Sequence, residues 1–193
     1  MLGVVVTPLA TCEGPQHWCC RILERCEMSS LSDDFKAAFR HHPAGVALIT
    51  ATVDNIPYGL TVSSLASLSI DPVAVSFSLT KESGAAGAVL SANTFMIHLL
   101  GEDHHELATN FARPGAPRFT ADQGFEFLST GEPYFPLAPV ALRASLHSSI
   151  SIGGSRLIAA EVHDVLVKDH QQHLVYQNRQ YLNLSEHLKA VAN

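Results

Sequence analysis

Two stretches of two-residue alternation constrain the fold of this chain more than any other feature. Over residues 73–80 large apolar side chains alternate with small or hydroxyl-bearing ones, and residues 142–152 repeat the pattern. Successive side chains of a β-strand point to opposite faces, so this alternation indicates strands with one buried face. The chain is therefore expected to be built on half-buried strands.

Other segments have the composition of strands or short helices. The expected strands are 45–53, 58–70, 95–100, 157–167 and 173–184. A helix is expected from Ser30, at capping-box spacing from Asp33, to the stop at Pro43, and further helices at 83–92 and 102–112. Since no strand-helix-strand rhythm of a parallel sheet is present, we predict a mainly β fold, a β-barrel with a few short helices. The Pro-rich and Gly-rich residues 113–139 predict a long ordered loop.

Length and charge restrict the kind of partner. A chain of 193 residues, of which only 16% are charged, fits one globular domain. A net charge of -6 without a basic run gives no reason to expect binding to nucleic acid or to a membrane, so a small-molecule partner is expected. Because the apolar runs are interrupted, we predict a soluble protein and take the cytoplasm as its location.

The first 27 residues differ in composition from the rest. They hold all four cysteines, and the cysteine spacing fits no metal-ligand motif. We predict an N-terminal extension outside the core at 1–27, with Met28 as an alternative start of translation, and a domain at 28–193. The pairs His41-His42 and His104-His105 are expected to be solvated, because neighbours on a helix point about 100° apart. No metal site is predicted.

A hydroxyl-rich stretch at 59–69 is the main candidate for a binding site. The signatures of hydrolases, zinc proteases, P-loops and Rossmann folds are absent from the sequence. Hydroxyls and free amides suit the polar edge of a flavin ring and its ribityl chain, and Lys81 with the amides near Ser83 suits a phosphate. The alternative is that these residues only decorate the exposed face of a strand. Composition leaves both open.

Five motifs in order resemble the flavin reductase domain family over residues 33–184. They are Phe39 to Pro43-Ala44-Gly45-Val46; Gly59-Leu60-Thr61-Val62-Ser63-Ser64; Leu68-Ser69-Ile70-Asp71-Pro72; the pair Asn93 to Leu100 and Leu107 to Ala112; and Arg118-Phe119. The resemblance implies a split β-barrel of the FMN-binding type. It also implies hydride transfer from NADH or NADPH to FMN or FAD in a homodimer with FMN at the subunit interface, with reduced flavin passed to a partner monooxygenase.

The resemblance also assigns site residues. Those implied to bind the flavin are Leu60, Thr61, Ser63, Ser64, Ser78, Thr80, Lys81, Ser83, Asn110 and Phe111. Those implied to contact NAD(P)H are Ser155, Arg179 and Tyr181. The flavin carries the chemistry, so no catalytic acid or base of the protein is expected.

Three departures from the family pattern leave alternatives open. Gly84-Ala85 follows the basic position of the phosphate loop, Gly153-Gly154-Ser155 replaces a Gly-Asp-His turn, and Asn178-Arg179-Gln180-Tyr181 replaces Arg-Gly-Arg-Tyr. One alternative is a diverged flavin-binding protein that does not oxidise NAD(P)H. Another is a flavoenzyme that reduces a different small organic substrate, with the 113–139 loop shaping its pocket.

Overall fold

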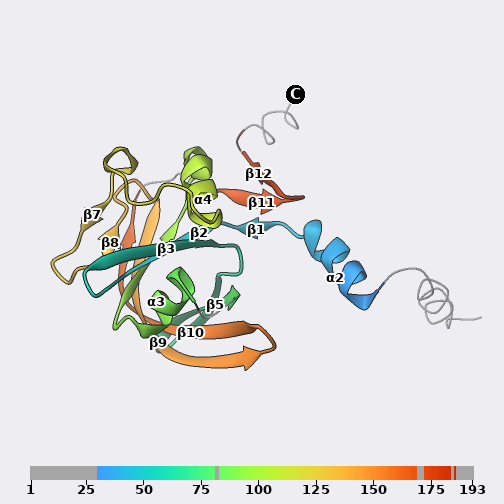
Figure 1. The fold of residues 1–193 in the computed structure, drawn as a ribbon, viewed down its shortest axis with the longest axis horizontal. Helices are drawn as coiled ribbons and strands as arrows, with labels where there is room; N and C mark the ends of the chain where they lie inside the picture. The colour runs from blue at the N-terminus through green and yellow to red at the C-terminus, as the bar shows by residue number, and fades with distance from the viewer. Residues whose placement is uncertain (1–29, 81–82, 169–171, 184, 186–193) are drawn as a thin grey trace, which may run out of the picture. The chain divides into compact units, whose positions relative to one another are not determined.

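The structure, a computed structural model, describes residues 30–80, 83–168, 172–183 and 185 (Figure 1). It divides into two units, Met1–His42 and Pro43–Asn193, and each is described by itself. The predicted extension at 1–27 lies outside the described residues. In the first unit, helix α2 (Leu31–Arg40) begins at its N-cap Ser30, whose hydroxyl accepts a hydrogen bond from the Asp33 amide. No helix in the described ranges is long and apolar enough to cross a membrane.

A seven-stranded antiparallel sheet dominates the second unit. Its strand order is β3-β2-β6-β9-β10-β5-β4. The strands are β2 (Ala47–Val53), β3 (Ile56–Val62), β4 (Ala66–Ile70), β5 (Val73–Thr80), β6 (Phe95–Leu99), β9 (Val140–Ile152) and β10 (Ser155–Val167). The two alternating stretches of the sequence fall in β5 and β9, as predicted.

Shorter elements surround this sheet. They are β1 (Ala44–Gly45), α3 (Ala85–Ser91), η1 (Glu102–His104), α4 (His105–Ala112), η2 (Ala121–Gln123), β7 (Glu126–Phe127), β8 (Pro133–Tyr134), β11 (Val175–Gln177) and β12 (Gln180–Leu182). The mainly β fold with few short helices is confirmed. The expected strand at 173–184 is instead a hairpin, β11–β12, because two residues of positive φ, Asn178 and Arg179, turn the chain.

The connection between β3 and β4 curls the sheet. These strands are the two edges of the sheet, yet only residues 63–65 join them. A flat sheet of seven strands would separate its edges by about 29 Å, whereas the connection spans about 14 Å at most. The edges must therefore approach each other, although β3 and β4 form no ladder. The result is a barrel that stays open between these two strands, and the expected single extended stretch at 58–70 is two strands.

Two apolar clusters lie on opposite sides of β2. The first fills the barrel and includes Ile49, Phe77 and Phe95. The rings of Phe77 and Phe95 meet edge to face, with their centroids 6.0 Å apart. Helix α3 contributes Val89 to this cluster. The second lies under α4 and includes Leu48 and Phe111. Because Leu48 and Ile49 are adjacent in β2, the strand alternation itself assigns them to different clusters.

A buried histidine joins β6 to two neighbouring segments. The side chain of His98 is fully buried, its Nδ1 lies 3.2 Å from the Leu48 carbonyl oxygen, and its Nε2 lies 3.0 Å from the Phe135 amide nitrogen. The Phe135 N–H donates to Nε2, so Nδ1 carries the proton that bonds Leu48. This is a neutral ring, and burial lowers the pKa of His98 from 6.5 to about 4.

The protein is expected to lose stability in mild acid because of His98. Between pH 6.5 and pH 4 the unfolded chain protonates this histidine and the folded chain does not, so the fold is destabilised as pH falls. The loss between pH 7 and pH 5 is expected to be about 2 kcal/mol. Urea unfolding at both pH values measures it, with His98→Gln as the non-titrating control. His104, whose pKa is also lowered by burial, contributes in the same direction in both proteins. An equal loss in His98→Gln would contradict this assignment.

Candidate functional site

A hydrogen bond pins the β3–β4 connection to β5. The Ser64 hydroxyl accepts from the Ser78 amide at 2.9 Å and lies 3.3 Å from the Ser78 carbonyl oxygen. Ser63 and Ser64 are both exposed. The Ser64 side chain thus ties the connection to β5. Residues 63–65 lie outside the strand pairings of both neighbouring strands.

The outer side of β5 continues the hydroxyl groups of this connection. Val75, Phe77 and Leu79 are buried in the barrel, so the alternate residues Ser78 and Thr80 face outward. Ser155 of β10 pairs with Thr80, and exposed Ser83 follows three residues after Thr80. Ser64, Ser78, Thr80 and Ser155 lie on this side of the sheet, and we call them, with the exposed Ser63 next to Ser64 in the connection, the hydroxyl face. Lys81, the predicted phosphate ligand, lies outside the described residues.

Of the other predicted flavin residues, Leu60 faces the barrel, and the rest lie at α4. Leu60 packs on the barrel cluster, and the Thr61 hydroxyl donates to the Ala108 carbonyl of α4 at 2.8 Å. Phe111 is buried, while Asn110 is half-buried beside it. The side chains of Leu60, Thr61 and Phe111 therefore hold β3 and α4 in position, and with them the connection at 63–65 that follows β3. They offer no free polar group to a ligand.

The predicted nucleotide contacts are divided between the two places. Ser155 lies on the hydroxyl face opposite Thr80. Tyr181 lies beside α4, where its ring is 5.3 Å from that of Tyr176 and both pack on the cluster containing Phe111. Burial raises the pKa of Tyr181, and a hydrogen bond with Thr109 of α4 opposes that rise. Arg179 is exposed in the β11–β12 turn.

Arg118 has a structural role that sequence reasoning did not predict. Its guanidinium donates to the carbonyl oxygens of Gly59 at 3.1 Å, Arg113 at 2.9 Å and Asn110 at 3.4 Å, and lies 5.7 Å from the centre of the Phe111 ring. Glycine is required at position 59, since a Cβ there would lie only 2.5 Å from an atom of the Phe111 ring. The sequence signal was the Arg118-Phe119 motif of the family resemblance, which assigned no role to the arginine.

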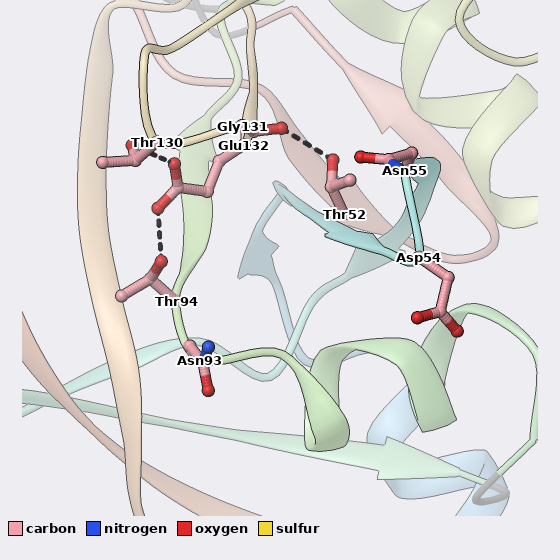
Figure 2. A pocket seen from close by; sticks show the side chains of 8 residues that line it. All are labelled: Thr52, Asp54, Asn55, Asn93, Thr94, Thr130, Gly131 and Glu132. Carbon is pink, nitrogen blue, oxygen red and sulfur yellow. Dashed lines mark hydrogen bonds between the residues drawn. The ribbon is translucent and has the colours of Figure 1, made fainter.

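A polar pocket of about 280 Å³ lies elsewhere on the barrel. Figure 2 shows its lining: Thr52, Asp54, Asn55, Asn93, Thr94, Thr130, Gly131 and Glu132. Asp54 and Asn55 form the β2–β3 turn, at the opposite end of β3 from Ser63. Burial favours a raised pKa for Glu132, but hydrogen bonds from Thr130, Thr94 and Arg143 lower it to about 2. This carboxylate is already satisfied, and the lining includes no predicted site residue.

Comparison with known families identifies the class of protein to which this barrel belongs. The family model "Flavin reductase like domain" matches residues 39–185, so the chain belongs to this family.

Known relatives and solved structures resemble most of the chain. The "NADH:FMN oxidoreductase" of Rhodococcus qingshengii is 37% identical over 125 residues, which are 65% of each chain, so the match spans less than two thirds of that relative. The reductase component of a 4-nitrophenol 4-monooxygenase/4-nitrocatechol 2-monooxygenase from Rhodococcus opacus is 35% identical over 67% of this chain and 69% of its own. The crystal structure of a flavin reductase domain protein from Arthrobacter sp. FB24 superposes with a TM-score of 0.74. It is 31% identical and covers 79% of this chain and 94% of its own.

The two serines of the connection are expected to differ in their roles. Ser64→Ala removes the bond to β5 and should lower the free energy of unfolding by about 1 kcal/mol. Ser63→Ala should leave stability within about 0.5 kcal/mol of the parent and weaken FMN binding by roughly three- to tenfold, the effect of one lost hydrogen bond. Urea unfolding and fluorescence titration with FMN measure these effects. Equal destabilisation by both variants, or unchanged FMN affinity of Ser63→Ala, would contradict the assignment.

Proposed function

We propose that this protein is an NAD(P)H:flavin oxidoreductase, which transfers a hydride from NADH or NADPH to FMN or FAD in the cytoplasm and supplies reduced flavin to a monooxygenase. The observation that carries the proposal is the hydroxyl face, which lies at the β3–β4 connection of a flavin-reductase barrel. The proposal of a monooxygenase partner is supported by the Rhodococcus opacus relative, which is named as the reductase component of a monooxygenase.

The residues of the hydroxyl face fit a flavin. The isoalloxazine ring presents carbonyl oxygens and ring nitrogens along one edge, and hydroxyls and main-chain amides can bond both kinds of atom. Ser63, Ser78 and Thr80 would hold this edge and the ribityl chain, and the main chain of 63–65 is outside the ladders. Asn110 would close the site from α4. When bound, the flavin accepts the hydride itself, which agrees with the expectation of no protein acid or base.

A second copy of the chain would complete the site. The hydroxyl face is an open surface, and large apolar side chains surround it: Ile150 is 61% exposed, Ile152 71% and Leu157 44%. Leu157 pairs with Ile150 and with Ser78, and Ile152 pairs with Ser155, so these side chains share one surface with the hydroxyls. A cluster of this kind is typical of an interface. In the proposed homodimer the partner subunit covers the flavin and excludes water.

The proposed activity is tested by the visible spectrum of the FMN-loaded protein under anaerobic conditions. Flavin absorbance should bleach at a catalytic rate when NADH or NADPH is added, because the nicotinamide delivers a hydride to the bound flavin. Free FMN at the same concentration is the control. A flavin that binds and stays oxidised with both nucleotides would contradict the proposed reductase and favour the diverged flavin-binding protein.

A further inference from the structure

Three segments that are distant in the sequence form the polar pocket near Thr52. They are the β2–β3 turn, the connection between α3 and β6, and the turn between β7 and β8 (Figure 2). The Thr52 hydroxyl donates to the Gly131 carbonyl at 2.7 Å, and the Thr50 hydroxyl donates to the Pro133 carbonyl at 2.5 Å. These two hydrogen bonds fasten β2 to the β7–β8 segment, so two walls of the pocket are held together.

The Glu132 carboxylate fixes the third wall. It accepts hydrogen bonds from the hydroxyls of Thr130 and Thr94, and Thr94 belongs to the connection between α3 and β6. Arg143 compensates its charge, with the guanidinium Nε 2.8 Å from Glu132 Oε1, and the same arginine also lies 3.6 Å from Asp164. The pocket is therefore formed before any ligand arrives, which lowers the entropic cost of binding.

Three side chains of the lining are available to a ligand. Asp54, Asn55 and Asn93 are exposed, and they form no side-chain hydrogen bond or ion pair with the described part of the chain. The eight lining residues include no lysine, arginine or histidine and no large apolar side chain. Asp54 is thus a carboxylate without a countercharge in a hollow lined by amides and hydroxyls, and a concave surface of one sign of charge attracts the opposite sign.

The donor set favours an organic cation over a metal ion. Among the described residues no three His, Cys, Asp or Glu side chains are grouped to hold a metal, whereas calcium takes six to eight oxygen ligands. The pocket of about 280 Å³ has room for several water molecules, each of which takes about 30 Å³ in the liquid, or for a small organic molecule. An ammonium group offers three N–H donors and no acceptor, so it matches carboxylate and amide oxygens.

We propose that this pocket binds a small molecule with an ammonium group, which donates to the Asp54 carboxylate and to the amide oxygens of Asn55 and Asn93. Asp54 supplies the charge, and the hydrogen bonds of Glu132 maintain the shape of the pocket. The site is separate from the hydroxyl face, because Asp54 and Asn55 lie at the opposite end of β3 from Ser63. The inference therefore goes beyond the proposed function and does not depend on it.

The test is a titration of the isotope-labelled protein with ethanolamine, followed by the chemical shifts of its main-chain amides. Ethylene glycol is the matched neutral ligand, since it has a hydroxyl where ethanolamine has the ammonium group. Ethanolamine should shift the amides of Asp54, Asn55 and Asn93 until they saturate, and ethylene glycol at the same concentration and ionic strength should not.

Two variants identify the charge that binds. Asp54→Asn should weaken ethanolamine binding by about three- to tenfold, because it removes one partly exposed charge pair. Asparagine also tolerates the positive φ of 51° at this position, so the turn is retained. Asp122→Asn is the matched control, which removes the same charge from an exposed position in η2 outside the lining and should leave the affinity unchanged.

The other outcomes would overturn the proposal. Ethanolamine that shifts no amide of the lining, or equal shifts with ethylene glycol, would show that the pocket does not select an ammonium group. Equal affinities of Asp54→Asn and the parent would remove Asp54 from the site. Calcium chloride that saturates the same amides at a lower concentration than ethanolamine would assign the pocket to a metal ion instead.

Discussion

The bond between Ser64 and the main chain of Ser78 holds together the part of the barrel on which the site depends. Residues 63–65 connect the two edges of a seven-stranded sheet, and no ladder joins those edges. The curled sheet buries Phe77 and Phe95 inside and leaves Ser78 and Thr80 outside. The same curl brings Ser64 to the main chain of β5, and the exposed Ser63 precedes it in the connection. The curling of the sheet into a barrel therefore also brings the residues of the hydroxyl face together.

Helix α4 is positioned by contacts with the same strand. The Thr61 hydroxyl donates a hydrogen bond to the Ala108 carbonyl of α4. The Phe111 ring fills the space next to Gly59, and Arg118 links the Gly59 carbonyl to the end of the helix. Gly59 and Thr61 face α4, and Leu60 between them faces the barrel, so one strand supports both apolar clusters. Residues 59–61 of β3 therefore connect α4 to the residues 63–65 that follow them along the chain.

The sequence predicted the parts of this fold that local patterns encode. Alternation predicted β5 and β9, and the Ser30 cap and Pro43 bounded α2. The division of 58–70 into two strands was not predicted, because Ser and Thr residues continue through the break. The places of β3 and β4 at the two edges of the sheet depend on pairing with strands that are distant in the sequence. Family resemblance identified Thr61 and Ser64, but their hydroxyls bond residues 47 and 14 positions away. The contacts of Arg118 were not predicted either, because its acceptors are main-chain carbonyls, and that of Gly59 is 59 positions away.

The central claim is that the flavin binds on the hydroxyl face at the β3–β4 connection. A crystal structure of the protein with FMN tests it most directly. The account predicts that the polar edge of the ring contacts residues 63–65 and the outer side of β5 near Ser78 and Thr80, with a second copy of the chain over it. Flavin bound in the polar pocket near Thr52 and Glu132, or on any surface that leaves the β3–β4 connection free, would contradict the account.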